Sequence, residues 1–385
     1  MLALVRDFGV VLAVLGALAG AAAAQSGPEP GGSGSAALGV GMFGDKPATS
    51  LDLGIDFEAG DLALGIGGRV RWLAGEGVRD EDWNDPSEIA TALRYLSYRR
   101  APRGRVPGVA LAAGALADVR LGHGSIVGGY TSGLDVDHRR LGAQARVAGE
   151  RYRVDGMIDD VVAPRIVGGH GRWSTGGRAS FGATFAGDID AGAPMASVDA
   201  ELAFAHGTPY ADLVGIADGG AGVHAGVRFD EATSTGTRFL ATLEARAGTG
   251  DYVPAWVGPL YEVDRVARDA GMIPDGLGGI GGLVEAGVDV PEVGTIATSY
   301  AVRRGLPDQA TVRALAPYYR GVQAGLWGAT EIRRGGERAI AAEVRAQLPH
   351  GLFAVADAAR LYRDAGGMLE PVWIATVAFG SALAF

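Results

Sequence analysis

Apolar and polar residues alternate along most of this chain, and that period of two constrains its fold more than any other feature. Residues 51–58 place leucine, isoleucine and phenylalanine on one face and aspartate, glycine and glutamate on the other. An α-helix would spread both sets around its circumference, whereas a β-strand separates them. The pattern recurs in residues 62–72, 196–204, 221–229, 239–246 and 340–348. We therefore expect an all-β fold with about 20 candidate strands, of which 210–218 and 352–362 are ambiguous because neither face is cleanly apolar.

The composition excludes several classes of protein. Cysteine is absent, so the chain has no disulfide, no thiolate metal ligand and no cysteine nucleophile. A formal net charge of −10 disfavours nucleic acid binding, which requires a basic surface. The chain is 48% hydrophobic, which is too apolar for a disordered acidic segment. Its 64 glycines lack the triplet period of collagen.

The N-terminus has the three parts of a secretory signal peptide. Arg6 gives a weak basic region, residues 8–20 are apolar, and residues 22–24 are small alanines before Gln25. We expect export to remove residues 1–24 and residues 25–35 to form a flexible linker. No later stretch has about 18 apolar residues without charge, so we expect no transmembrane helix. Such an exported chain is periplasmic, secreted or a barrel.

A soluble sandwich or propeller would also show alternation, but three features disfavour it. Charged residues recur at central positions of the polar face, no blade-length repeat is present, and short turns alternate with longer connectors. If alternate connectors lie at opposite ends, the three longest, at about 74–89, 122–137 and 248–279, fall on one side. This alternation of short turns and longer connectors favours a β-barrel formed by residues 36–385.

The last fifteen residues carry the most specific motif. Every second residue from Trp373 to Phe385 is apolar except Ser381, and the other face is mostly small. This run resembles the C-terminal assembly signal of bacterial outer-membrane β-barrels, in which Phe379, Leu383 and the terminal Phe385 match. The resemblance implies the porin-like class but no specific family. It implies a closed antiparallel up-and-down transmembrane β-barrel of 16–20 strands, in contact with outer-membrane lipid and, during biogenesis, with the barrel-assembly machinery. Closure agrees with the physics, since a strand in lipid has no water for unpaired backbone groups.

The alternation also predicts which charges face the lumen. These are Asp52, Asp56, Arg69, Arg71, Arg146, Arg153, Asp155, Arg178, Asp199, Glu201, Arg228, Asp230, Glu244, Arg246, Glu285, Asp289, Glu343 and Arg345. Such a wall orders ions and polar solutes in a channel. For any single residue we favour a plainer interpretation, in which Arg–carboxylate pairs keep a polar interior rigid.

Motifs for catalysis or metal binding are weak. His123, Ser125, Asp135, Asp137 and His138 share one connector, but their spacing defines no geometry, and the segment lacks the glycine and distal glutamate of a calcium loop. We expect no catalytic residue, no metal and no cofactor. Barrels of sixteen or more strands leave an aqueous channel unless something fills it. We therefore expect a passive channel for small polar or ionic solutes, with a non-transporting anchor as the alternative and a barrel enzyme third.

The longest connector, at about 248–279, contains a helical pattern. Leu260, Val263 and Val266, with Ala267 and Ala270, repeat at helical spacing between Pro259 and Gly271. Such a helix needs a surface to cover its apolar stripe. We expect the connector to fold inward and narrow the pore, although a helix lying across the outer loops is an equal alternative.

Overall fold

The computed structural model describes residues 31–217, 220–249, 252–269, 279–303, 306–319, 321–332 and 336–384. The barrel strands are β1 Gly31–Phe43, β2 Lys46–Ala59, β3 Leu62–Leu73, β5 Leu93–Arg100, β6 Gly108–Gly114, β9 Gly142–Ala148, β10 Tyr152–Ile158, β11 Ile166–Ser174, β12 Ala179–Asp188, β13 Ala193–Leu202, β14 Thr208–Ile216, β15 Gly220–Ala232, β16 Arg238–Thr249, β17 Ile280–Val290, β18 Gly294–Val302, β19 Asp308–Tyr319, β20 Val322–Ile332, β21 Arg338–Gln347, β22 Leu352–Asp364 and β23 Leu369–Ala384. Shorter elements are β4 Gly77–Val78, β7 Val119–Arg120, β8 Gly128–Tyr130, the 3-10 turns Asp80–Asp82 and Pro349–Gly351, and helices α3 Pro86–Ala90 and α4 Tyr261–Asp269.

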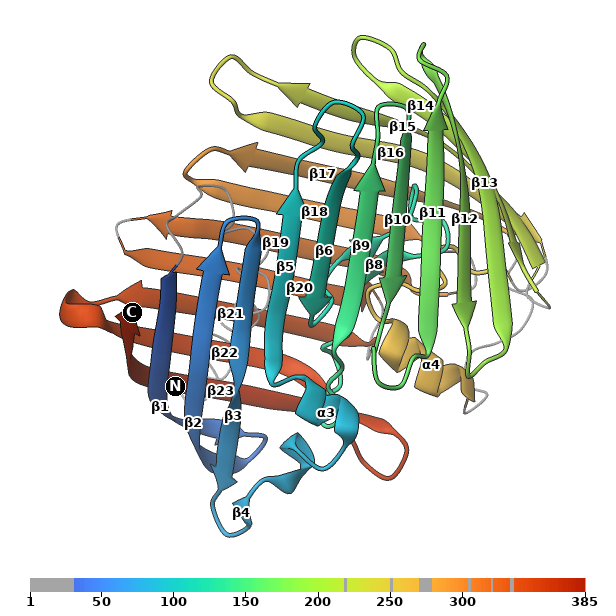
Figure 1. Cartoon of the computed structure of the whole chain (residues 1–385). Helices are drawn as coiled ribbons and strands as arrows, with labels where there is room; N and C mark the ends of the chain where they lie inside the picture. Colours follow the sequence, from blue (N-terminus) through green and yellow to red (C-terminus); the bar gives the residue numbers. More distant parts are fainter. Residues whose placement is uncertain are drawn as a thin grey trace.

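The sheet closes on itself into an antiparallel barrel of 20 strands, at the upper end of the predicted 16–20. Each barrel strand pairs with the next along the chain, and β1 pairs with β23, so the described ends of the chain lie close together (Figure 1). Closure leaves no unpaired edge. The all-β prediction is confirmed. Strand β1 begins at Gly31 rather than Ala36, because Ser33 and Ser35 already pair with both β2 and β23.

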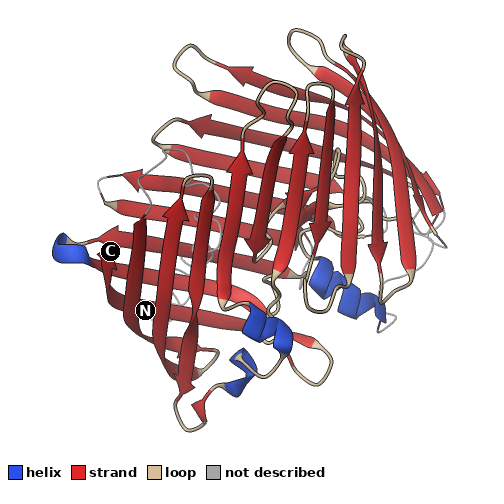
Figure 2. Ribbon diagram, viewed as in Figure 1, coloured by secondary structure: helices blue, strands red, loops and turns tan. Residues whose placement is uncertain are grey.

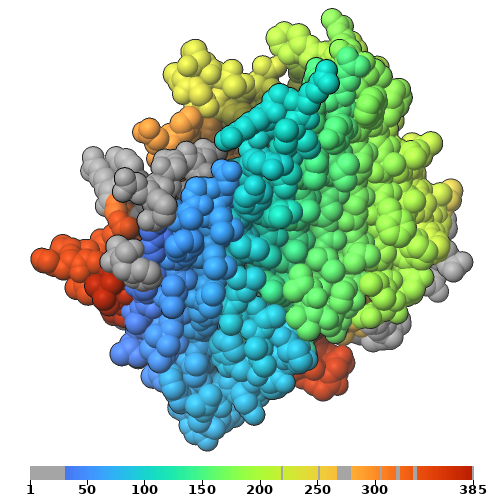
Figure 3. All heavy atoms as spheres, viewed as in Figure 1, coloured from blue at the N-terminus to red at the C-terminus, as the bar shows by residue number. Residues whose placement is uncertain are grey.

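The outer face of the barrel is apolar, as the alternation predicts. Across the closing seam Leu38 lies opposite Phe379 and Val40 lies opposite Val377, and all four side chains point outward. Leu38 is 69% exposed and Phe379 63%. The side chains on the face of the barrel shown in Figure 3 form one continuous surface. An apolar face of this extent would drive aggregation in water, so it fits a lipid environment.

The long connections all lie at one end of the barrel. Those after β3, β6 and β16 cover residues 74–92, 115–141 and 250–279, and each leaves the barrel at the end away from Gly31 and Ala384. Helices α3 and α4 lie at this same end (Figures 1 and 2). The prediction that the three longest connectors share one side is therefore confirmed.

Two of these connections fold into the barrel, and we name them the hairpin loop (residues 115–141, with β7 and β8) and the helical loop (described for residues 252–269, with α4). Val127 of the first forms a parallel bridge with Val257 of the second. Leu260, Tyr261 and Tyr130 are almost fully buried. The expected inward fold of the longest connector and its helix are thus present, with α4 beginning two residues after Pro259.

Among the described residues, the two largest apolar cores lie where the inward loops meet the wall. One joins Leu134 and Leu260 to wall residues of β20–β23. The other joins Tyr130 and Tyr261 to wall residues of β10–β14. Among the described residues, no helix is both long and apolar enough to cross a membrane. The expected signal peptide, residues 1–24, lies outside the described residues.

Candidate functional site: the charged barrel interior

The inward loops are fixed by a buried polar network. The Tyr130 hydroxyl donates to Glu262 Oε1 at 2.7 Å, and Arg140 Nη1 donates to the same oxygen at 2.9 Å and to Asp159 at 2.8 Å. Charge-assisted bonds of this kind are short and strong when both partners are buried. Glu262 therefore ties the helical loop to the hairpin loop.

Tyr261 anchors the same helix to the wall. Its hydroxyl donates to the buried carboxylate of Asp188 at the end of β12. Burial, and then this bond, raises the pKa of Tyr261 far above its usual value. The phenol therefore stays protonated and remains a donor throughout the physiological pH range.

The third long connection covers the opposite side of the mouth. Asp82 accepts from Arg71 of β3 at 2.8 Å and also from Arg79, whose guanidinium reaches Asp137 of the hairpin loop. Burial raises the pKa of the Asp137 carboxyl, although Arg79 opposes that effect. The Arg79 guanidinium also lies 4.4 Å from the centre of the Phe43 ring. These contacts join the three long connections into one structure.

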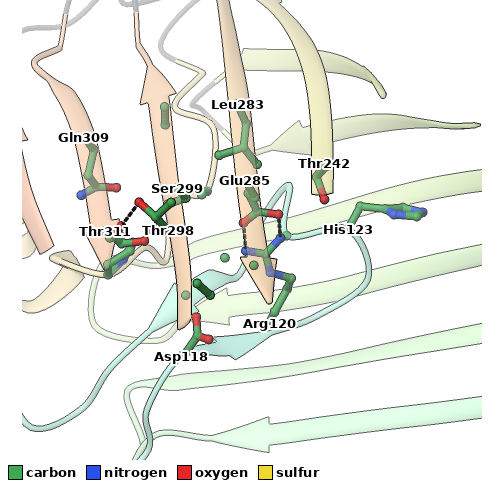
Figure 4. A pocket seen from close by; sticks show the side chains of 18 of the residues that line it. Asp118, Arg120, His123, Thr242, Leu283, Glu285, Thr298, Ser299, Gln309 and Thr311 are labelled. Atoms are coloured by element: carbon green, nitrogen blue, oxygen red, sulfur yellow. Dashed lines mark hydrogen bonds and ion pairs between the residues drawn. The ribbon is translucent and has the colours of Figure 1, made fainter. Parts of the chain in front are cut away.

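The first cavity, of about 310 Å3, lies between the inward loops and strands β15–β20 (Figure 4). In Figure 4, Arg120 of the hairpin loop meets Glu285 of β17, with Nη1 2.9 Å from Oε2. Ser299 and Thr311 share a hydrogen bond of 2.6 Å on the wall beside them. Among the described residues, the lining of this cavity includes five arginines and two carboxylates: Arg120, Arg228, Arg246, Arg303 and Arg313 against Asp118 and Glu285. The cavity is therefore lined by an excess of positive charge.

The second cavity, of about 420 Å3, lies between the hairpin loop and the wall formed by β1–β5 and β21–β23. Arg69 bridges Asp52 at 2.6 Å and Asp357 at 3.5 Å within it. Arginines again outnumber carboxylates in the lining: Arg69, Arg71, Arg94, Arg139, Arg140 and Arg345 against Asp52, Asp135, Glu343 and Asp357. Both cavities share this bias although the chain has a net charge of −10.

Most of the predicted lumen charges lie on the inner face of the wall. The structure places there Asp52, Asp56, Arg69, Arg71, Arg146, Arg153, Asp155, Asp199, Glu201, Arg228, Glu244, Arg246, Glu285, Glu343 and Arg345. Many are paired as the plainer interpretation expects: Asp155 binds Arg146 at 2.5 Å and Arg153 at 2.6 Å. Arg345 instead lies over the Phe353 ring, 4.5 Å from its centre.

The other three predicted residues lie in a turn or at exposed strand ends. Arg178 belongs to the turn between β11 and β12, and its guanidinium lies 5.7 Å from the centre of the exposed Phe204 ring, so it is not a lumen residue. The prediction was wrong there because the alternation was carried past the end of the strand. Asp230 pairs with Arg238, and Asp289 accepts from Thr295 at 2.9 Å, both exposed near strand ends.

The connector motif with histidine, serine and aspartate is divided by the fold. Asp135 binds His138 at 2.8 Å, and Asp137 binds Arg79. His123 instead points to the wall, where its Nε2 lies 3.7 Å from Asp199 and its ring stacks on Tyr210. The connector therefore does not bring His123 together with Asp135 or Asp137.

Several inward groups were not predicted from the sequence. They are His170, Arg172, Asp212, His224, Arg313 and Asp357. The alternation could have identified His224, because Arg228 and Glu244 on the same face were predicted from it to face the lumen. Of the proposed assembly signal, Phe379 and Leu383 point outward with 63% and 71% exposure, and Phe385 lies outside the described residues.

The structure resembles solved bacterial proteins over most of its length, at low identity. Acinetobacter baumannii OccAB3 has a TM-score of 0.35 and 8% identity, over 92% of this chain and 99% of that chain. The outer membrane protein OpdK of Pseudomonas aeruginosa gives 0.35 and 9% over the same shares, and P. aeruginosa OccK9 gives 0.36 and 10% over 92% and 98%. No family model and no curated protein sequence matches the chain.

Proposed function

We propose that this chain is a porin-like passive channel of the bacterial outer membrane, carrying small polar or ionic solutes through a charged lumen. The observation that carries the proposal is the pair of charged cavities inside a closed barrel whose outer face is apolar. Strands in lipid must satisfy every backbone group among themselves, which the closed ring does. An interior lined by fixed charges then offers solutes partners that replace their water of hydration.

The balance of charge in the cavities favours anions. The arginine excess is greatest in the first cavity, where three of the arginines reach Glu201, Glu244 and Glu331, which do not line it. The cavity surface is therefore richer in guanidinium donors than in carboxylate acceptors. Low-dielectric walls strengthen such a field. We infer that small anions pass more readily than cations of the same size.

Arg313→Gln tests this preference. Arg313 lies on β19 in the first cavity and is paired with Asp118 at 2.6 Å, so its loss leaves a carboxylate unpartnered there. We expect the chloride-to-potassium permeability ratio to fall by roughly two- to threefold. The measurement is the reversal potential across a planar bilayer under a potassium chloride gradient.

Arg178→Gln is the matched control, because it removes the same charge at a turn away from both cavities. Its reversal potential should equal that of the wild type. Equal shifts in the two variants would show that the ratio reports overall charge, and a wild-type ratio favouring potassium would contradict the anion preference.

The terminal residue gives a separate test of the membrane placement. Phe385→Asp should leave export intact but prevent insertion, because a terminal aromatic is expected at the membrane interface. The variant should accumulate in the periplasm and be degraded, as judged by fractionation and heat-modifiable migration in gels. Phe385→Tyr keeps the aromatic ring and should insert normally. Normal insertion of the aspartate variant would refute the proposed assembly signal.

A non-transporting barrel is the second candidate, and the filled interior favours it. The two inward loops contact both sides of the wall through apolar cores that include Leu134, Leu260, Tyr130 and Tyr261. A barrel held closed in this way could anchor a partner in the envelope. Liposome swelling in small sugars and amino acids separates the two candidates, since only a channel admits the solute.

A further inference from the structure

Two buried carboxylates lie directly opposite each other on the inner wall. Asp199 of β13 faces Asp212 of β14 in the strand register, and the two residues are 7% and 1% exposed. Like charges at directly opposed positions destabilise a sheet, and burial strengthens the repulsion. The pair therefore needs a compensating positive charge or a proton nearby.

The neighbouring carboxylates are neutralised by arginine, and this pair is not. Glu201 binds Arg172 and Arg228, and Glu244 binds Arg246. Within the part of the chain that the structure describes, the ion-pair partners of Asp199 are histidines. Asp212 forms no ion pair there, although one of its oxygens accepts from the Ser125 hydroxyl of the hairpin loop. One oxygen of Asp212 is fully buried and has no hydrogen-bond partner. A buried carboxylate oxygen left unsatisfied in this way requires an explanation.

The tip of the hairpin loop brings an imidazole to the pair. His123 stacks on Tyr210 with ring centres 3.9 Å apart and an interplanar angle of 3°, which fixes the direction of its Nε2. Gly122 and Gly124, at φ of +57° and +86°, flank it. A Cβ at Gly122 would lie 3.1 Å from His170 and Thr184, a tight contact at a left-handed φ, so glycine favours the close approach of the tip to the wall.

We propose that His123, Asp199 and Asp212 bind one divalent transition-metal ion of the Zn2+ class. Their candidate ligand atoms all lie within 4.8 Å of one another. Ligands of tetrahedral zinc, at about 2.0–2.1 Å from the metal, are separated by about 3.3 Å, so the site closes by small side-chain rotations. One nitrogen and two carboxylate oxygens leave a fourth position for water, and the two carboxylates balance the charge of the ion.

The residues around the three proposed ligands are placed to orient them by hydrogen bonds. His170 Nε2 lies 3.1 Å from the second oxygen of Asp199, where its N–H orients the carboxylate toward the ion. His224 is opposite Asp212 but is not a ligand, because Glu244 occupies its Nδ1 at 3.0 Å and the Tyr252 hydroxyl occupies its Nε2. Bound metal would therefore join the hairpin loop to β13 and β14, holding in place a loop that lines both cavities.

Metal titration of the full chain, refolded in detergent after treatment with a chelator, tests the site. We expect one Zn2+ per chain by calorimetry, and with Co2+ the visible absorption of a tetrahedral site. His123→Gln and Asp212→Asn should each weaken binding at least a hundredfold and abolish the Co2+ band, since even the loss of outer-shell partners costs 10–100-fold. Heat-modifiable migration verifies that each variant is folded.

His138→Gln is the matched control, because it removes a histidine that also faces an aspartate, Asp135, at 2.8 Å but lies on the exposed side of the hairpin loop. It should bind Zn2+ like the wild type. Absence of Zn2+ and Co2+ binding in the folded wild type, or equal binding by the three variants, would overturn the proposal. Conductance is measured separately, so a channel without a metal site and a metal site without a channel are distinguishable outcomes.

Discussion

Leu243→Arg should destabilise the barrel in lipid by about 2–4 kcal/mol, the cost of an arginine near the middle of a bilayer. Leu243 lies in the middle of β16, points outward with 51% exposure, and is flanked on the outer face by Val227 and Val284. No acceptor for a guanidinium is present among these neighbours. The measurement is the free energy of unfolding in urea after refolding into phospholipid vesicles.

The adjacent residue supplies the matched control. Thr242 faces the first cavity between Arg228 and Glu285, so Thr242→Arg places the same side chain in a wet, polar environment with a carboxylate beside it. Its cost should be about 1 kcal/mol or less. Equal losses in the two variants would contradict the assignment of inner and outer faces, since the same side chain is introduced at adjacent positions of one strand.

Replacing the helical loop residues 252–269 with a short Gly–Ser bridge should raise single-channel conductance severalfold and weaken ion selectivity. Pro254, Ala255 and Pro259 of this loop line the first cavity, and Leu260 and Val263 cover the wall beyond it. Barrels of this strand number enclose an aqueous channel when nothing fills them. The deletion removes one of the two segments that fill this one.

Gly–Ser replacement of residues 365–368, the turn between β22 and β23 at the same end of the barrel, is the control for loop engineering. This turn is exposed apart from Ala365, which is half-buried, and it lines neither cavity, so conductance should not change. If the helical-loop deletion folds, as shown by heat-modifiable migration, and conducts like the wild type, the helical loop does not limit the pore.

The sequence predicted the barrel well because the physics that selects it is local. Alternation of side chains along a strand is a property of each segment, and it places Asp199, Glu244 and Leu243 on the faces that the structure shows. The end of the barrel at which each long connector lies follows from counting strands, because successive connections of an up-and-down barrel alternate between its two ends. The inward fold of the helical loop could be expected because an apolar helical stripe must be covered.

The remaining parts of the site depend on contacts between distant segments. Residues 210–218 and 352–362 were ambiguous because Val214 and Ile216, and likewise Ala359 and Leu361, face inward and pack in the apolar cores formed with the inward loops. Where a loop replaces water inside the barrel, the inner face becomes apolar and the alternation disappears. Asp212 lies in such a segment and was missed for that reason.

The partners of the histidine at the loop tip could not be predicted from the sequence either. His123 was considered with Asp135 and Asp137, its neighbours in sequence, but its partners are Asp199 and Tyr210 on the wall. Spacing along the chain carries no information on which strand a loop tip will meet. The two glycines beside His123 were visible, but their need for a positive φ is a property of the folded loop.

Single-channel recording of the purified, refolded chain in a planar bilayer tests the central claim most directly. A channel with charged constrictions predicts discrete steps of current that increase with salt, scale linearly with small voltages and favour chloride over potassium. Heat-modifiable migration and protection from protease show whether the barrel is folded and inserted. A folded, inserted barrel that gives no current steps would contradict the channel and favour the non-transporting barrel.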